Sequence, residues 1–304
     1  MAALVRCATS AGALGRHRTR FARRGHRLRI RSQLLGTLCP LGHPRERVRA
    51  VVAGRVASAL PLPSPSFPSP TRPRSAGSEG EFMPLHAPDF ERLFVPGARH
   101  DLSFGMVATV RLQQDAWLWL PTGRVVAGEP AMLGAGEGSE HAFVQRVEPG
   151  RYPLVLVVAA YDMPEDRPTL AEIAAAKLVI RDEPVVSWEM ALVDGQDLAE
   201  LDDDEFFGYA VDSATGGFID AANTALLRDD EFTDRMFSEI AGTDNAAATT
   251  LTDDEGRPCL VAFSSGSADG HYPTWVGRTA DGEVACFLTD FFILTDDEGE
   301  DEDE

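Results

Sequence analysis

The chain has little cysteine, little histidine and a single lysine, Lys177. No CxxC pair occurs, which argues against a cysteine zinc site and against a disulfide framework. The four cysteines are Cys7, Cys39, Cys259 and Cys286. Unpaired cysteines fit a reducing compartment, so we expect a cytoplasmic protein. After residue 82 no histidine has a second one at helical spacing, and we expect neither a metal site nor a cofactor.

Long apolar runs and familiar catalytic motifs are also missing. Without a run of about eighteen apolar residues, we expect no membrane-spanning helix and no membrane partner. The sequence holds no GxGxxG, GxxxxGK[ST], HExxH or GxSxG pattern. The acidic stretch 201–205 lacks the alternating ligands, central glycine and final glutamate of an EF-hand loop. No motif indicates a reaction, so whether the protein is an enzyme stays open at this point.

Charge divides the chain into two unlike parts. Residues 1–81 hold fifteen arginines and three glutamates, a net charge of +12, whereas the remaining 13 basic and 45 acidic residues give −32. So acidic a surface repels phosphate backbones, and we expect no nucleic-acid partner. A basic protein partner suits it better, because opposite charges speed up encounter. The alternative is that the acidic charge only maintains solubility. The sequence does not indicate an oligomeric state.

The first 82 residues are not typical of a folded domain. RHRTRFARRGHRLRIR (16–31) is too charged to fold around a core, and PLPSPSFPSPTRP (61–73) has the composition of a linker. We expect 1–82 to be a disordered basic and proline-rich extension, either a transit segment or an over-extended reading frame with translation beginning at Met83. A single folded β-rich domain is expected over 83–294, and an acidic disordered tail over 295–304.

Short apolar runs separated by Gly, Pro and Asp turns predict antiparallel strands from Phe104 onward. The sequence predicts two hairpins, which pair 141–147 with 152–161 and 177–180 with 185–193, and further strands at 259–264, 274–277 and 284–294. Residues 169–176 are compatible with either a helix or a strand. We expect a mainly β (α+β) fold of antiparallel sheets, sandwich-like, with one or two helices inserted around 220–242.

The clearest helix signal follows Asp229 and Asp230, which can accept the free N–H groups of a first turn. Phe232, Met236, Phe237 and Ile240 share one face, and Gly242 ends the segment. We expect this face, Phe237 included, to pack against the sheet. A shorter helix is expected over 220–227, with Asp220 as its N-cap.

Two glycine-rich segments remain as places for a site: GYAVDSATGGFID (208–220) and FSSGSADGHYPTWVGRTADG (263–282). The candidate site residues are Asp212, Ser265, Gly266, Asp269, Gly270, Tyr272 and Asp290. In the simplest interpretation both segments are turns whose polar side chains bond nearby amides and whose glycines permit positive φ.

Two hypotheses give these segments a function. In the first, Asp212, Asp269 and Asp290 converge with Tyr272 on a cleft, where paired carboxylates do acid–base work or hold a metal. In the second, the aromatic side chains Tyr272, Trp275 and Trp188 are exposed anchors for a protein or a glycan.

Four motifs also carry a family resemblance. They are GRYP (150–153), SWEMAL (187–192), GYAVDSATGGFID, and FSSGSADGHYPTWVGRTADGEV leading into TDFFIL (289–294). In these the chain resembles the mainly bacterial proteins of the domain of unknown function 4241 family, over residues 150–294. The resemblance implies a domain boundary and carries over no activity. We expect non-catalytic binding of a protein partner, with a hydrolase using paired aspartates in a cleft between 208–220 and 263–282 as the alternative.

Overall fold

The computed structural model describes residues 21–22, 85–102, 105–135, 138–163, 170–202, 205–242, 246–266 and 269–295. All of them belong to one compact unit. The expected extension 1–82, apart from 21–22, and the expected tail from 296 onward lie outside the described residues.

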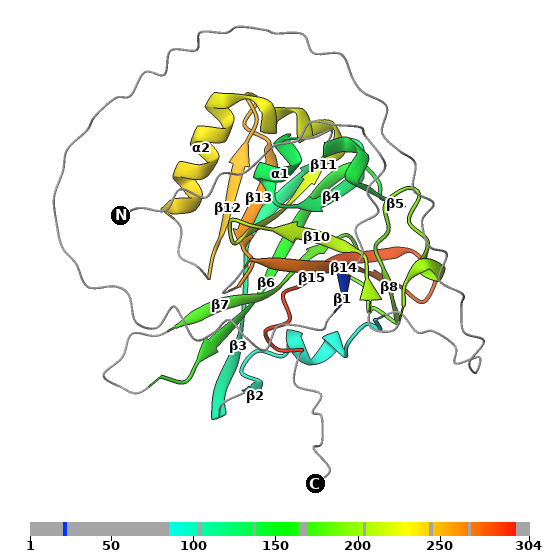
Figure 1. The fold of residues 1–304 in the computed structure, drawn as a ribbon, viewed down its shortest axis with the longest axis vertical. Coiled ribbons are helices and arrows are strands. Elements are labelled where there is room, and N and C mark those ends of the chain that lie inside the picture. The colour runs from blue at the N-terminus through cyan, green and yellow to red at the C-terminus, as the bar shows by residue number, and fades with distance from the viewer. Residues whose placement is uncertain are drawn as a thin grey trace, which may run out of the picture. The chain divides into compact units, whose positions relative to one another are not determined.

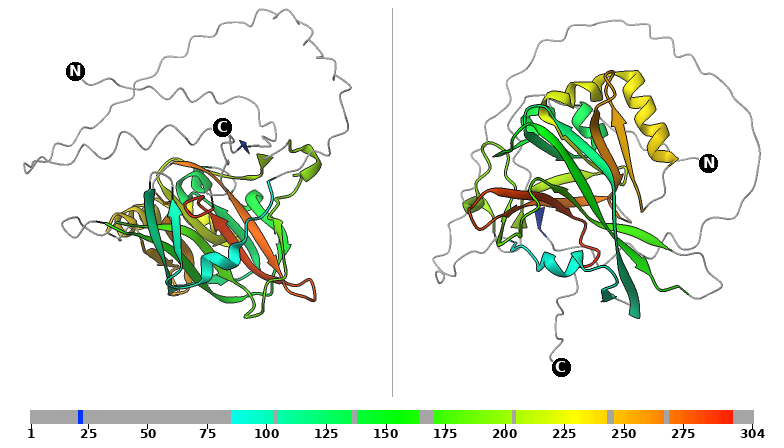
Figure 2. Two further views of the ribbon diagram at one scale, coloured as in Figure 1. Left: turned by 90° about the horizontal axis from the view of Figure 1, so that it is seen from below. Right: turned by 180° about the vertical axis from the view of Figure 1, so that it is seen from behind.

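The fold is mainly β, as predicted, with two antiparallel sheets, one of them a half-barrel, and a few short helices (Figures 1 and 2). The larger sheet has the order β10 (Gly208–Val211), β14 (Gly270–Arg278), β15 (Val284–Asp290), β7 (Ala171–Val179), β6 (Gly150–Tyr161), β3 (Met106–Leu120) and β2 (Arg99–Leu102), and β8 (Ser187–Met190) also pairs with β14. The smaller sheet has the order β12 (Ala248–Thr252), β13 (Pro258–Ser264), β11 (Thr215–Asp220), β4 (Arg124–Gly128) and β5 (Ala142–Arg146). The two-residue strands β1 (Phe21–Ala22) and β9 (Glu205–Phe206) pair with each other.

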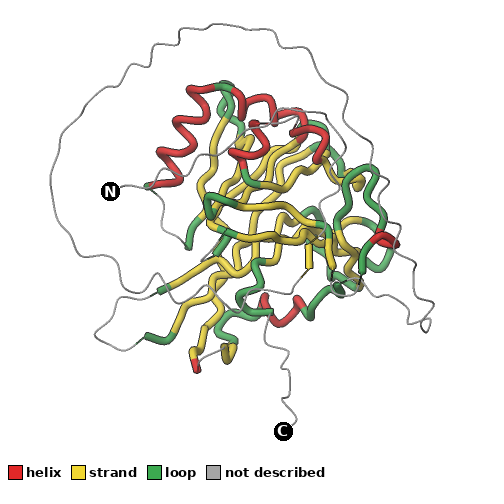
Figure 3. Tube along the Cα trace, viewed as in Figure 1, coloured by secondary structure: helices red, strands yellow, loops and turns green. Residues whose placement is uncertain are grey.

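Short helices connect these strands. They are η2 (Phe90–Phe94), α1 (Pro130–Ala135), η4 (Gly138–His141), η5 (Leu198–Glu200), η6 (Ala221–Arg228) and α2 (Asp230–Ala241), the η elements being 3₁₀ helices. Figure 3 shows α1, η6 and α2 gathered on the outer side of the smaller sheet. Among the described residues, no helix has the length and apolar character that crossing a membrane requires.

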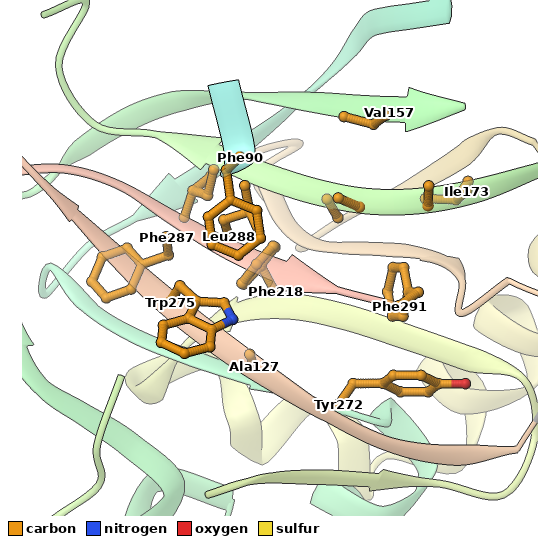
Figure 4. Close-up of a cluster of buried hydrophobic side chains, with 14 of the residues drawn as sticks. Phe90, Ala127, Val157, Ile173, Phe218, Tyr272, Trp275, Phe287, Leu288 and Phe291 are labelled. Atoms are coloured by element: carbon orange, nitrogen blue, oxygen red, sulfur yellow. The ribbon is translucent and has the colours of Figure 1, made fainter. Parts of the chain in front are cut away.

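The smaller sheet is buried on both faces, because successive side chains of a strand point to opposite sides. Phe218 and Val261 lie in the larger core cluster, between the sheets. Phe263 of β13 meets Phe291 there with ring centroids 6.0 Å apart. Figure 4 shows Phe218 and Phe291 in this cluster. The sequence neighbours of Phe218 and Val261, Ile219 and Leu260, lie in a second cluster with residues of η6 and α2. The smaller sheet therefore forms a middle layer between the larger sheet and the helices.

Both predicted hairpins are wrong. β5 pairs with β4 and not with β6, and β7 pairs with β6 and β15 and not with β8. The ambiguous segment 169–176 contributes to strand β7, which begins at Ala171. Local alternation marks where a strand lies, but the partners of β7 are chosen by packing between distant parts of the chain.

The predicted helices are confirmed, with one error in the buried face. Asp229 caps α2 by accepting the N–H of Phe232 at 2.9 Å, and Asp220 caps η6 by accepting that of Ala222 at 2.8 Å. Phe232 and Met236 are buried, but Phe237 is 44% exposed. At 3.6 residues per turn, Phe237 lies one position past the buried stripe, so the apolar face is narrower than the composition suggested.

Candidate functional site

The two glycine-rich segments lie side by side, because β10 and β14 are neighbouring antiparallel strands. Tyr209 faces Tyr272 in the register, and Val211 faces Gly270. A further bond joins the turns beyond these strands, where Ser265 donates its backbone N–H to the carbonyl of Ala214 at 3.0 Å. Asp212 follows Val211, the last residue of β10, and Asp269 precedes Gly270, the first residue of β14. Because Val211 faces Gly270, the register brings these two candidate residues to the same end of the sheet.

Tyr272 is a core residue and not an exposed anchor. Its side chain is 4% exposed, and its ring packs edge-on against Phe291 with centroids 5.0 Å apart (Figure 4). Burial raises the pKa of the Tyr272 hydroxyl to about 12, with a further increase from Asp269 and an opposing hydrogen bond from Ser265. Tyr272 is therefore a neutral hydroxyl that lies near Ser265 and Asp269.

The other two aromatic candidates also pack against the core. Trp275 is 2% exposed, and Trp188, which is half-buried, packs edge-on against Phe90 with ring centroids 4.8 Å apart. The burial of Tyr272 and Trp275 contradicts the hypothesis that all three side chains are exposed anchors. Aromatic side chains bury a large apolar area, so strand positions that face the core favour them.

The two candidate glycines are required for different reasons. Gly266 has φ of +75°, and a Cβ there would lie 2.6 Å from Cδ1 of Ile293. Gly270 has no positive φ, but a Cβ there would lie 2.8 Å from the Tyr272 hydroxyl oxygen. Glycine at 270 therefore makes room for a side chain of its own strand.

The three candidate aspartates have different environments. Asp290 is 1% exposed, and its carboxylate accepts the N–H of Phe292 and the hydroxyl of Thr295, each at 2.9 Å. Asp212 and Asp269 are exposed. Asp290 holds the turn that follows β15, and that turn includes Thr295, the first residue of the expected tail. Its two oxygens are therefore occupied by structural hydrogen bonds.

The structure adds two glutamates that the sequence analysis did not single out. Glu129 is 4% exposed, and its carboxylate accepts the backbone N–H of Asp212 at 2.6 Å. Glu172 accepts the hydroxyl of Tyr161 at 2.7 Å, and its charge also raises the pKa of Tyr272. The pKa of Tyr161 is raised by burial and by Glu172. Glu129 follows strand β4 in the sequence Gly-Glu-Pro. This break after a strand is the one sequence signal that could have identified it.

The chemistry available at this end of the sheet is limited. Within the described ranges, no group of three or more His, Cys, Asp or Glu side chains is arranged to hold a metal ion. A small cavity of about 10 Å³ lies elsewhere, at the β-bulge of β3, lined by Gln113, Asp115, Ala116, Leu154, Leu156 and Ala248. Such a volume holds about one water molecule. The described residues around Tyr272 thus form a packed, hydrogen-bonded strand end.

These features define a two-sheet β protein whose glycine-rich strand ends are closely packed. The chain belongs to the family of proteins of unknown function DUF4241, whose model matches residues 118–289. That range extends further toward the N-terminus than the motifs over 150–294 indicated, and it takes in the end of β3 and all of β4. The curated proteins and the solved structures yielded no significant match.

Proposed function

We propose that this protein is a non-catalytic binding module for a basic protein partner in the cytoplasm. The observation that carries the proposal is the outer face of α2. Asp230, Glu231 and Asp234 are all exposed there, and Phe237, an aromatic side chain without a place in either core cluster, is 44% exposed beside them. An exposed aromatic side chain next to charges of one sign offers a partner both an apolar anchor and a charged contact.

Residues i, i+4 and i+7 of a helix lie along one stripe, and Asp230, Asp234 and Phe237 have this spacing. The nearest base on the helix, Arg235, is directed elsewhere, since its guanidinium bonds the carbonyl of Thr252 at 2.7 Å and lies over the Phe232 ring. The stripe therefore carries negative charge at Asp230 and Asp234 and an apolar ring at Phe237. It suits a partner that presents arginine or lysine next to an apolar side chain.

A titration with a synthetic amphipathic arginine-rich peptide tests the proposal. Phe237→Ala should weaken binding at least about tenfold, as loss of a central aromatic does, and Asp230→Asn with Asp234→Asn should flatten its salt dependence. Matched controls are Met132→Ala, an exposed apolar residue of α1, and Glu148→Gln with Asp182→Asn, two exposed acids outside α2 and its contacting strand β12. Equal losses in variants and controls would refute the assignment of α2.

The hydrolase remains a second candidate, supported by the register that places Asp212 and Asp269 at one strand end. Two exposed carboxylates can share acid and base roles when their pKa values differ. Asp212→Asn and Asp269→Asn should then each abolish turnover of a model ester or glycoside while the melting temperature stays unchanged. Turnover that survives both substitutions would remove this candidate.

A further inference from the structure

The two-residue strand β9 presents a backbone edge to an arginine-rich segment of the same chain. β9 pairs antiparallel with β1, so that Phe21 faces Phe206 and Ala22 faces Glu205. β1 is the short dark-blue strand in Figure 1. β1 is the one part of residues 1–84 that the structure describes.

The hydrogen bonds of β9 explain why an edge is open there. The carbonyl of Glu205 accepts the N–H of Leu85 at 3.0 Å, and its N–H donates to the carbonyl of Asp202 at 3.1 Å. Because successive residues of a strand direct these groups to opposite edges, those of Phe206 point the other way, toward β1. The Phe206 side chain is buried, with its ring 5.6 Å from that of Phe292, and this anchors β9 to the core.

Charge favours the same pairing. The stretch 194–205, DGQDLAELDDDE, contains seven acids and no base, whereas RHRTRFARR (16–24), which includes β1, contains five arginines and no acid. In the first stretch, Asp194, Asp197 and Asp202 are exposed. Extended peptides add to sheet edges through main-chain bonds, and the charges beside the strand select the occupant.

We propose that segment 16–24 docks on β9 as an added strand and so occupies the acidic stretch 194–205. The β9 edge is thus a binding site for arginine-rich extended peptides that the chain itself fills. A basic partner that uses this edge must displace the segment first. This inference does not depend on the α2 proposal, because it concerns a different surface and an intramolecular occupant.

Disulfide trapping in the full chain tests the docking. Ala22 and Glu205 face each other as a non-hydrogen-bonded pair, for which the Cα atoms are about 4.5 Å apart, within the range a disulfide spans. Ala22→Cys with Glu205→Cys, in a chain where Cys7 and Cys39 are Ser, should form an intramolecular bond. Ala22→Cys with Glu255→Cys, at an exposed turn residue, is the matched control. Cys259 and Cys286 are buried and can stay.

The expected result is a 22–205 bond that forms several-fold faster than the 22–255 bond, with the advantage lost near 1 M salt, where the Debye length is about 3 Å. Equal rates for the two pairs, or bonds found only between chains, would overturn the proposal.

A second measurement separates specific docking from general attraction. Changing Arg18, Arg20, Arg23 and Arg24 to Ser should slow the 22–205 bond and should let the full chain bind a labelled RHRTRFARR peptide more tightly. Changing Arg45, Arg47, Arg49 and Arg55 to Ser removes the same charge outside the segment and should do neither. If both sets act alike, the attraction is not specific to the segment and the proposal fails. The α2 variants serve as a reference, because they should leave trapping unchanged.

Discussion

Two tyrosine rings fold back over glycines two residues earlier, each at the start of a strand. A Cβ at Gly150 would lie 3.1 Å from the hydroxyl oxygen of Tyr152, and one at Gly270 would lie 2.8 Å from that of Tyr272. The surrounding tetrapeptides are alike, GRYP in β6 and GHYP in β14. In this arrangement a side chain of the same strand, and not backbone conformation, favours glycine, and the contact is closer at Gly270 than at Gly150.

Gly270→Ala should therefore destabilise the protein by about 1–3 kcal/mol, the usual result of forcing extra volume into a packed site. The free energy of unfolding from urea titration measures this. Tyr272→Leu also destabilises, but with the ring gone the added methyl has room. The double variant should then lose less than the sum of the two single losses. Strict additivity would show that Tyr272 and Gly270 are not coupled.

The turn after β10 shows why single residues escape prediction. The glycines of TGG were expected to supply positive φ, yet Gly216 and Gly217 lie inside β11, and Ala214 has the positive φ, 52°. A Cβ at Gly216 would lie 2.8 Å from the Tyr209 hydroxyl. A glycine in a sequence can indicate either a turn position with positive φ or a strand position that a neighbouring side chain approaches closely. Only the structure of the neighbouring strand distinguishes the two.

At the scale of elements, helix α2 carries a buried apolar residue, Met236, directly before an exposed one, Phe237, and the two should differ in their contribution to stability. Met236 is 1% exposed in the second core cluster, so Met236→Ala should cost about 2–5 kcal/mol by emptying a core site. Phe237→Ala should change the free energy of unfolding by less than about 0.5 kcal/mol, as exposed substitutions do. Denaturant titration of both variants checks this. A large loss for Phe237→Ala would mean that its ring is covered, and would remove the α2 surface from the proposed function.

Element existence was readable from the sequence where caps and apolar periodicity agreed, as at Asp229 and Asp220. Strand partners were not readable. β14 pairs with β10 along its first half and with β8 along its second half, and both partners lie far from β14 in the sequence. Such pairings depend on which faces bury together, so local turns such as Glu-Pro-Gly wrongly suggested hairpins.

In the candidate site, too, some features could be predicted from the sequence and others could not. The sequence placed Asp212 and Asp269 in two segments, and the register brings them to one strand end. It could not show that Asp290 would be buried as a turn cap or that Tyr272 would face Phe291, since burial and the pairing of β14 with β15 are decided by tertiary packing. Glu129 reaches Asp212 from another strand end, and no local pattern records that approach.

At the scale of the whole molecule, a chain that begins at Met83 should fold cooperatively and melt within a few degrees of the full chain. Every strand of the two large sheets lies between Arg99 and Asp290, and β1 contributes a single two-residue pairing. Few core contacts are lost, so the melting temperature should shift little. Calorimetry of both chains measures this. Insolubility or loss of a cooperative transition would place the domain boundary before Met83.

Stability should also decline in alkali, because the fold buries neutral phenols and thiols. Burial raises the pKa of Cys259 and of Cys286 to about 11 and that of Tyr272 to about 12. The pKa values of Tyr161 and Tyr209 are raised as well. In each case the folded value exceeds the unfolded one, so the native state keeps protons that the unfolded chain has already released.

The sign of the pH dependence follows from this difference. Below about pH 9 both states are protonated and the full stability is present, whereas between about pH 9 and pH 12 the unfolded chain ionises first. The free energy of unfolding should therefore fall steadily over that range, and urea titrations at several alkaline pH values measure the slope. Tyr272→Phe removes one of these groups and should make the decline shallower between about pH 10 and pH 12. A slope that Tyr272→Phe leaves unchanged would show that this hydroxyl reaches water in the folded protein, contrary to its packing against Phe291.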